Sequence, residues 1–156
     1  MIRHALPRDE PAIIEALQGY LHGVTVAGHD VVYDASTLPA IVSYQDGQIN
    51  GVLTYQLTSD GLEVVTINVS DRRHGVGTTL IAAAVETARA AGAHRVWLIT
   101  TNDNLDAIRF YQRRGMRITA VSPGAVDRAR LLKPSIPVIG EYGIEMHDEL
   151  TLEMPV

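Results

Sequence analysis

The sequence predicts a mixed α/β fold built around one central sheet. Three observations predict this fold. The first is that stretches with strand-like alternation and stretches with helical periodicity follow one another along the chain. The second is that no internal repeat or linker divides its 156 residues. The third is the composition, because 46% hydrophobic and 20% charged residues are typical of a globular protein. We therefore expect residues 1–156 to form a single domain.

The first third of the chain is expected to contain a strand, a helix and a loop. Residues 2–6 are typical of a short strand, which Pro7 ends. Residues 8–11 are typical of the charged first turn of a helix, and apolar residues then recur at helical spacing up to Leu21. Residues 22–39 have a mixed composition, and we expect a loop with a short helix there.

The middle of the chain is expected to form three antiparallel strands. Strand-like stretches cover residues 41–44, 51–57 and 62–69. Asp46-Gly47 and Ser59-Asp60-Gly61 separate these stretches, and such sequences are typical of hairpin turns.

The second half is expected to alternate helices and strands. The expected elements are helices over 75–91, 104–113 and 125–132 and strands over 95–100, 116–121 and 144–154. Because residues 96–99 form an unbroken apolar run, we expect their strand to be covered on both faces. A Pro- and Gly-rich stretch over 122–143, here called the insertion, encloses the last helix.

Composition argues against several classes of function. Thirteen Lys and Arg against eighteen Asp and Glu give a formal charge of −5, so we expect no nucleic-acid partner. The chain has no cysteine, which excludes a thiol nucleophile, and the spacing of its six histidines does not fit a metal site, so we expect no metal. We find no secretory signal or membrane-spanning apolar run, and we expect a cytoplasmic protein without membrane contact.

A strand leads through a basic, glycine-containing loop into a helix at residues 69–80. Such a loop presents backbone N–H groups and the positive end of a helix dipole to an anion. Gly75 and Gly77 have no side chain to block close approach, and Arg72 and Arg73 can add charged contacts. The segment predicts a phosphate or pyrophosphate as its ligand.

Two common phosphate-binding motifs do not fit this loop. A P-loop needs a lysine within it, and the single lysine of the chain is Lys133. A dinucleotide fingerprint needs a small residue where Leu80 stands. An ordinary helix start with solvated arginines stays open as the alternative.

A second informative segment follows the strand over 95–100. Asn104 and Tyr111 are seven residues apart. At about 100° per residue they therefore differ by only about 20° around a helix. An amide and a phenol thus share one stripe, although Asn104 as a helix cap and Tyr111 as a packing residue are open alternatives.

Together the two segments resemble the GNAT superfamily of acyl-CoA-dependent N-acyltransferases. The family's Arg/Gln-x-x-Gly-x-Gly/Ala loop is matched by residues 72–77. Its Asn-x-x-Ala-x-x-Phe-Tyr-x-x-x-Gly-Phe pattern is matched by Asn104, Ala107, Phe110, Tyr111 and Gly115, with Met116 in place of the final aromatic residue. The resemblance covers residues 1–121.

The resemblance implies a fold, an activity and a donor. The fold is a mostly antiparallel sheet that splays between its fourth and fifth strands and is flanked by helices. The activity is that of an N-acetyltransferase domain, which transfers an acetyl group from acetyl-CoA to a primary amine by direct attack in a ternary complex. A non-catalytic acyl-CoA-binding regulatory module and a different nucleotide-binding enzyme are the alternatives.

The resemblance also implies roles for individual residues. Three parts of the chain are expected to bind acetyl-CoA. The pantetheine arm is expected to pair with the backbone of Ile67, Asn68 and Val69, and Asn104 is expected to contact the cofactor near its pantetheine. The pyrophosphate is expected to be bound by Arg72, Arg73, His74, Gly75, Val76, Gly77 and Thr78. Tyr111 is expected beside the thioester sulfur. A phenol with a pKa of about 10 can protonate the leaving CoA thiolate.

Glu63 is the candidate general base. It alternates with Val65, Ile67 and Val69, so it lies among apolar neighbours on one strand face if no bulge breaks the alternation. In some relatives a glutamate on this strand removes the amine proton. The alternative is that Glu63 is exposed, because it lies two residues beyond the Asp60-Gly61 turn.

The resemblance implies that the first helix, the loop after it and the final strands shape the acceptor pocket. The residues implicated are His29, Asp30, Tyr33, Asp34, Glu141 and Tyr142. The partners expected are thus acetyl-CoA and an unidentified amine. Packing over a sheet edge or a contact in a homodimer are alternatives for the insertion.

Overall fold

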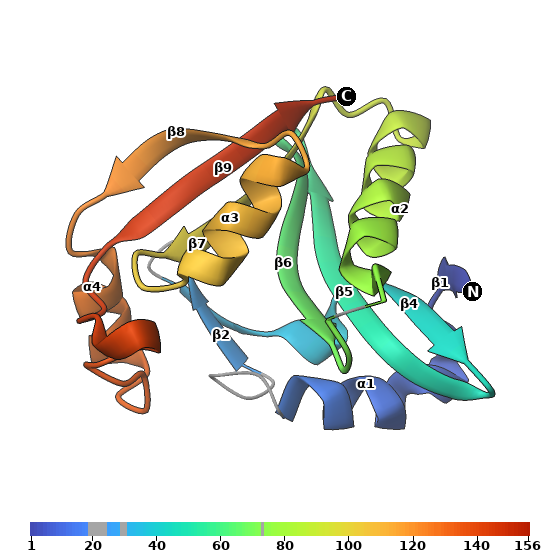
Figure 1. Cartoon of the computed structure of the whole chain (residues 1–156), viewed down its shortest axis with the longest axis horizontal. Helices are drawn as coiled ribbons and strands as arrows, with labels where there is room; N and C mark the ends of the chain where they lie inside the picture. The colour runs from blue at the N-terminus through green and yellow to red at the C-terminus, as the bar shows by residue number, and fades with distance from the viewer. Residues whose placement is uncertain (19–24, 29–30, 73) are drawn as a thin grey trace.

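The computed structural model describes residues 1–18, 25–28, 31–72 and 74–156. Among these, seven strands form one sheet in the order β1-β4-β5-β6-β7-β9-β8 (Figure 1). The strands are β1 (Ile2–His4), β4 (Ala40–Gln45), β5 (Gln48–Thr58), β6 (Gly61–Val69), β7 (Arg95–Thr101), β8 (Arg117–Ser122) and β9 (Glu149–Pro155). Neighbouring strands are antiparallel except for β6 and β7, which are parallel. The predicted mixed, mostly antiparallel sheet is confirmed.

Helices cover both faces of the sheet. The main core joins α2 (Val76–Ala90) and α3 (Leu105–Arg113) to one face, where Leu80, Tyr111 and Leu98 belong to the same cluster of buried side chains. The other face packs against α1 (Glu10–Gln18), which follows the 3-10 helix η1 (Pro7–Asp9). None of the helices in the described part of the chain has the length and apolar character needed to cross a membrane.

The strands β6 and β7 splay apart. Leu62, Glu63 and Val64 pair with Val96, Trp97 and Leu98, and β6 continues to Val69 without a further partner on β7 among the described residues. Figure 1 shows the two strands diverging beyond the paired part. The splay that the family resemblance implied is therefore present.

A β-bulge at Val65 interrupts the alternation of β6. The Cα partners of Thr54 and Tyr55 on β5 are Thr66 and Val64, so Val65 has no partner. Val64 packs in the core that contains α2, and its neighbour Glu63 must then face the opposite side of the sheet. The condition on which Glu63 was expected to share a face with Val65, Ile67 and Val69 is therefore not met, because the extra residue reverses the alternation between Glu63 and Ile67.

A hairpin replaces most of the loop expected over 22–39. Strands β2 (Thr25–Gly28) and β3 (Val31–Asp34) pair with each other, and the 3-10 helix η2 (Ala35–Thr37) follows. Four-residue strands are too short for their alternation to stand out in the sequence.

The strand β7 is less enclosed than its apolar run suggests. Val96, Leu98 and Thr100 are buried, whereas Trp97 and Ile99 are only half-buried. One face of β7 packs on the core below α2 and α3, and the other is partly open. The expectation of full cover on both faces is therefore wrong.

The insertion contains the predicted helix α4 (Ala125–Leu132), which lies against the β2–β3 hairpin. Four buried side chains from the helix and the chain after it form a separate small core: Val126, Ala129, Ile136 and Met146. The following segment contains the 3-10 helix η3 (Glu141–Gly143) and a single bridge between Ile139 and Glu145. The last strand begins at Glu149 rather than at residue 144, because the backbone of residues 144–148 bonds to the Asn102 side chain and to residues 138–140 instead of to a strand of the sheet.

Candidate active site

The backbone of β6 forms one wall of the splay. Ile67, Asn68 and Val69 are half-buried and pair with β5 on one side only. Their other side faces the gap that β7 leaves, so peptide groups there lack a strand partner among the described residues. An extended ligand that carries amide groups can add to such an edge by main-chain hydrogen bonds.

The loop after β6 leads directly into α2. Gly75 caps the helix with φ +70°, a left-handed conformation that favours glycine, and the space where its Cβ would lie is open. The first N–H groups of a helix have no acceptor within the helix and lie at the positive end of its dipole. Arg72, His74 and Thr78 are exposed in this region, and Arg73 lies outside the described residues. The loop is thus suited to an anion.

Glycine is needed at position 77 for a different reason than at position 75. A Cβ at Gly77 would lie 3.1 Å from Cζ of Phe110 on α3, so the small residue allows α2 and α3 to pack closely. The expectation that both glycines serve ligand approach is incomplete, because Phe110 already occupies the space beside Gly77.

His74 is paired within its own loop. Its Nδ1 lies 2.8 Å from Oδ2 of Asp71, and both side chains are partly exposed. The sequence predicted a ligand contact for His74 but not this acidic partner. The pair places a carboxylate beside the helix start, and its charge offsets part of the local positive potential.

Asn104, at the start of α3, and Tyr111, on α3, both have neighbours on β7. Asn104 is the N-cap residue, yet its side chain makes no capping bond, and its Nδ2 donates to Oγ1 of Thr100 at 3.1 Å. Tyr111 is 7% exposed in the core that contains Leu98, with its ring edge-on to Phe110. The predicted common stripe is therefore confirmed, and the capping alternative for the Asn104 side chain is wrong.

Met116 stands where the family pattern of the second segment has an aromatic residue. It is buried in the same core as Tyr111. Its backbone N–H donates to the carbonyl of Tyr111 at 3.1 Å, which fixes the turn after α3.

Glu63 is buried on the face of the sheet opposite α2 and α3. It is 4% exposed, and Oε1 accepts a hydrogen bond from Nε2 of Gln56 at 2.8 Å. The alternative in which the nearby turn exposes Glu63 is wrong, because the strand continues past the turn into the covered part of the sheet. Glu63 lies in the last paired stretch of β6 and β7, immediately before the splay.

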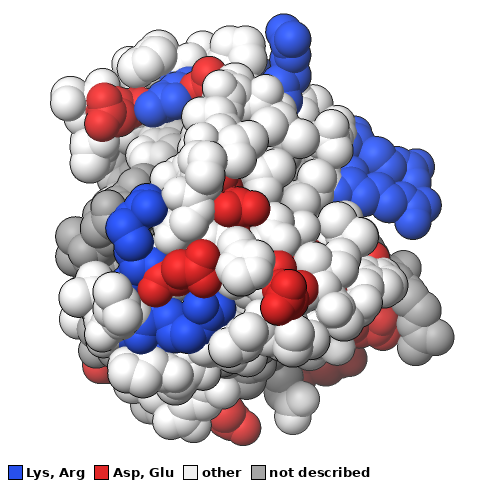
Figure 2. All heavy atoms as spheres, turned by 90° about the vertical axis from the view of Figure 1, so that its left-hand side faces the viewer, with Lys and Arg blue, Asp and Glu red and all other residues white. Residues whose placement is uncertain are grey.

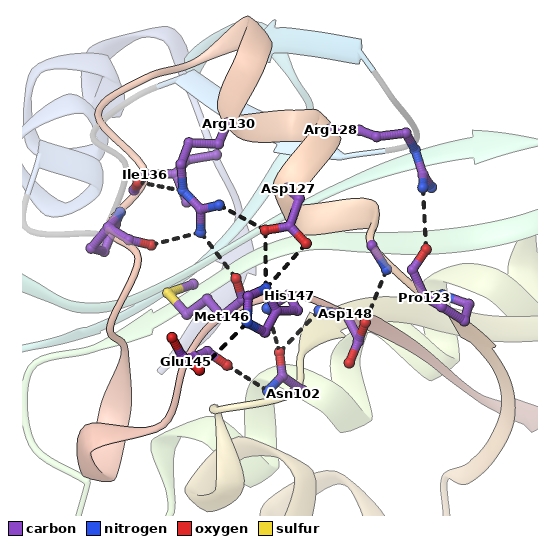
Figure 3. A network of polar contacts seen from close by, with 12 residues as sticks. Asn102, Pro123, Asp127, Arg128, Arg130, Ile136, Glu145, Met146, His147 and Asp148 are labelled. Carbon is purple, nitrogen blue, oxygen red and sulfur yellow. Dashed lines mark hydrogen bonds and ion pairs between the residues drawn. The ribbon is translucent and has the colours of Figure 1, made fainter.

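The turn between β7 and α3 binds the insertion and the segment that follows it. Oδ1 of Asn102 accepts the backbone N–H groups of His147 and Asp148, both at 3.0 Å, and its Nδ2 donates to the carbonyl of Glu145 at 2.9 Å (Figure 3). One amide therefore fixes residues 145–148 just before β9.

Asp103 binds the insertion itself. Its carboxylate is 1% exposed and accepts the hydroxyl of Thr101 at 2.5 Å and the backbone N–H of Glu141 at 2.8 Å. Sequence analysis missed both Asn102 and Asp103. The run of Asn and Asp residues indicates a turn, but it does not indicate which distant segments these side chains bind.

The helix α4 is bonded to the same segment. Figure 3 shows Asp127 and Arg130 pointing from α4 toward His147 and the backbone around Met146. Nδ1 of His147 lies 3.0 Å from Oδ1 of Asp127, and this contact raises the pKa of His147 and lowers the pKa of Asp127. Arg130 donates to the carbonyls of Ile136, Pro137 and Met146. These bonds fix α4 against the chain that leads into β9.

The acceptor candidates are only partly described. His29 and Asp30 lie outside the described residues, as do the side chains of Tyr33 and Asp34. Tyr142 is 67% exposed, and its hydroxyl donates to Oδ1 of Asp106 at 2.6 Å, which raises the pKa of Tyr142.

Charge at this end of the molecule is mixed. Figure 2 shows acidic and basic side chains close to one another on the face that includes the insertion, in keeping with the ion pair between Arg130 and Asp127. Within the described ranges, no three His, Asp or Glu side chains come together as a metal site would require.

Comparison with known proteins identifies the family. Residues 11–116 match the sequence model of the acetyltransferase (GNAT) family. The uncharacterized protein YdhI of Bacillus subtilis is 42% identical over 106 residues, which make up 68% of this chain and 66% of YdhI, slightly less than two thirds of its length.

Solved structures have the same fold. A Bacillus subtilis acetyltransferase in complex with CoA has 20% identity and a TM-score of 0.75 over 99% of this chain and 97% of that chain. Nourseothricin acetyltransferase has 28% identity and a TM-score of 0.66, again over 99% and 97%. From the match over residues 11–116, we conclude that the chain belongs to the acetyltransferase (GNAT) family.

Proposed function

We propose that this chain is an N-acetyltransferase that transfers an acetyl group from acetyl-CoA to a primary amine by direct attack in a ternary complex. The observation that carries the proposal is the splay of β6 and β7, together with a start of α2 that suits an anion and the buried Tyr111 of α3. Family membership supports the reaction class, and the CoA bound to a relative of the same fold supports the donor.

The donor is proposed to lie along β6. The free backbone edge at Ile67, Asn68 and Val69 suits the amide groups of the pantetheine arm. The N–H groups from Arg72 to Thr78 would hold the pyrophosphate at the helix start. Asn104 would contact the pantetheine from α3, where its side chain already bonds to the β7 residue Thr100.

The reaction needs one group to accept a proton and one to donate a proton. The amine nitrogen attacks the thioester carbonyl carbon, the C–N bond forms, and the C–S bond breaks with its electron pair on sulfur. Glu63 takes the proton from the amine, directly or through a water, and the hydroxyl of Tyr111 protonates the CoA thiolate. The products are the N-acetylated amine and CoA.

The arrangement of the two groups supports these roles. Tyr111 packs on the face that carries α2 and α3, and Glu63 faces the other side. An amine that arrives on the Glu63 side would therefore reach the thioester carbonyl from the side of the sheet opposite Tyr111. The partly open face of β7 lies on that side and gives the acceptor room.

The acceptor is proposed to be a cationic amine that binds between Glu63 and the insertion. Its chemical class is tested by a panel that includes amino acids, polyamines, peptides and nourseothricin, the last because a relative of the same fold is named for it. Release of the CoA thiol is the measurement. If no amine gives turnover although acetyl-CoA binds, the catalytic proposal is wrong and a non-catalytic binding module is the better description.

The acid role is tested with Tyr111→Phe. Loss of a general acid is expected to lower kcat by about 100-fold or more, with little change in acetyl-CoA binding because the ring is kept. Tyr44→Phe is the control, since the hydroxyl of Tyr44 bonds to Met1 and Arg3, and its strand β4 is separated from β7 by β5 and β6. Unchanged turnover in Tyr111→Phe would remove the assignment.

The base role is tested with Glu63→Gln, which keeps the shape of the side chain. We expect kcat to fall while binding of acetyl-CoA stays the same, because Glu63 lies on the acceptor side. Glu86→Gln on the exposed face of α2 is the matched control. Equal activity of Glu63→Gln and the wild type across the pH range would show that another group accepts the proton.

A further inference from the structure

Arg114 follows α3 directly, and its side chain reaches the first turn of α2. Its Nε donates to Oγ1 of Thr78 at 2.9 Å. Its guanidinium carbon lies 4.8 Å from the centre of the Phe110 ring, and that ring fills the space beside Gly77. Two contacts from two helices therefore hold the guanidinium in one place.

The position is electrostatically unusual for a cation. The first turn of α2 is the positive end of a helix dipole, and such an end favours anions over cations. In the described part of the chain, no ion pair joins Arg114 to a carboxylate. Asp71, the acidic residue of the loop before α2, is paired with His74. A fixed cation at a helix N-terminus becomes favourable when an anion lies between the two.

We propose that Arg114 binds a phosphate group of the CoA moiety. The inference rests on the proposed function, and it adds to the pyrophosphate loop a residue at a position that the family pattern of the second segment leaves unspecified. The bond to Thr78 uses only Nε, so the four N–H groups on Nη1 and Nη2 are available to the ligand. The group that Arg114 binds is a phosphate oxyanion, which belongs either to the pyrophosphate or to the 3′-phosphate of CoA.

Arg113 provides the matched control. It is the last residue of α3 and is exposed, and no hydrogen bond or ion pair joins it to another described residue. Arg113→Gln removes the same charge one residue away without touching α2. A general effect of net charge on an anionic ligand would therefore appear equally in both variants.

The experiment is calorimetric titration of the full chain with CoA, with dephospho-CoA, which lacks the 3′-phosphate, and with pantetheine, which lacks all phosphates. We expect Arg114→Gln to weaken CoA binding by about 10- to 100-fold and to leave pantetheine binding unchanged. Arg114→Lys should restore part of the affinity because it keeps the charge. Arg113→Gln should stay within about twofold of the wild type, as expected for an exposed charge.

The arms of the titration distinguish the two sources of phosphate. If Arg114→Gln weakens dephospho-CoA as much as CoA, the ligand of Arg114 is the pyrophosphate. If the effect is absent with dephospho-CoA, the ligand is the 3′-phosphate. Both results support the proposal.

Three results would overturn the proposal. Wild-type affinity of Arg114→Gln for CoA would show that the guanidinium contacts no phosphate. An equal loss with pantetheine would show that Arg114 only joins α2 to α3, a role that the melting temperature of each variant reports separately. A wild-type chain that binds no CoA at all would overturn the proposed function together with this inference.

Discussion

Gly140 lies where no other residue fits beside the buried carboxylate of Asp103. A Cβ at this position would lie 2.1 Å from Oδ2 of Asp103 and 2.7 Å from Cγ of Met146. The same oxygen accepts the N–H of Glu141 at 2.8 Å. The close approach of the backbone therefore lets the insertion close over a carboxylate that is buried at the end of β7.

Gly140→Ala is expected to lower the free energy of unfolding by about 1–3 kcal/mol, because the added methyl group overpacks this contact. Urea denaturation measures the change. In Asp103→Ala the atoms that the methyl group would strike are gone, so the double variant should lose less stability than the sum of the two single variants. Additive losses would contradict the contact.

At the scale of elements, the pair of Asp127 and His147 joins α4 to the chain before β9. Nδ1 of His147 is 3.0 Å from Oδ1 and 3.1 Å from Oδ2 of Asp127. Glu145 lies near the other ring nitrogen, with 3.8 Å between Nε2 and Oε2. The protonated ring is therefore favoured between two carboxylates, with Asp127 as the larger influence on its pKa.

The pair gives stability a pH dependence of known sign. Because the pKa of His147 is raised in the folded state above its usual 6.5, the protonated ring stabilises the fold fully below that value. The contribution is lost as the pH rises through the folded pKa. The difference in unfolding free energy between the wild type and His147→Gln should therefore shrink from mildly acidic to mildly alkaline pH.

His94→Gln is the control for this measurement, since His94 lies at the opposite end of β7 from Asn102. A wild-type advantage over His147→Gln that grew with pH would have the wrong sign and would contradict the ion pair.

A second charged contact fixes the connection from β1 to α1. Arg3 donates to both carboxylate oxygens of Asp9, at 2.5 and 3.1 Å, and the N–H of Leu6 donates to Oδ2 at 2.7 Å. The bond to Arg3 is the main cause that lowers the pKa of Asp9 to about 2, and the bond from Leu6 follows.

The lowered pKa predicts a loss of stability in acid. The carboxylate of Asp9 stabilises the fold above its usual pKa of 3.8, and this contribution is lost as the pH falls through about 2. Asp9→Asn should unfold more easily than the wild type near neutral pH and should show less change across the acidic range. Asp46→Asn, at an exposed turn, is the matched control. Parallel acid profiles of Asp9→Asn and the wild type would contradict this account.

At the scale of the whole molecule, the splay divides the sheet into two halves, and in the described part of the chain they pair only through residues 62–64 of β6. One half contains β1, β4, β5 and β6, and the other contains β7, β9 and β8. The core formed with α2 and α3 spans both halves. A ligand in the splay contacts both halves and is expected to stabilise the native state as a whole.

Acetyl-CoA should therefore raise the melting temperature. A ligand at 100 times its Kd adds about 2.7 kcal/mol to stability, which corresponds to about 5–10 °C for a chain of this size. Differential scanning fluorimetry measures the shift, and pantetheine should give a smaller one at equal concentration because it lacks the phosphates. No shift with acetyl-CoA at any concentration would contradict a donor site in the splay.

The elements that could be predicted from the sequence are those with local causes. The start of α2 follows from Gly75 and its neighbours, and the common stripe of Asn104 and Tyr111 follows from helical periodicity alone. The splay came only from the family resemblance, since no local signal marks where two strands stop pairing.

The features that were missed depend on distant parts of the chain. The bulge at Val65 is set by the register with β5, and no glycine marks it. Asp103 and Asn102 bond to residues 38 to 46 positions away, and their partners could not be read from a turn sequence. Arg114 depends likewise on Thr78, 36 positions earlier in the chain.

The contacts of the β7–α3 turn have a consequence for how the protein can diversify. Asn102 and Asp103 bind the insertion and the segment that follows it through the backbone N–H and C=O groups of Glu141, Glu145, His147 and Asp148. Every residue type except proline offers these same groups. Gly140, Asp127 and Arg130 cannot change freely, because close packing or side-chain bonds of their own also hold this region. Exposed side chains such as that of Glu141 can change over evolutionary time, or be randomised in a library, without loosening these backbone bonds. Under the proposed function, acceptor preference can then drift at such positions while the donor half stays constant.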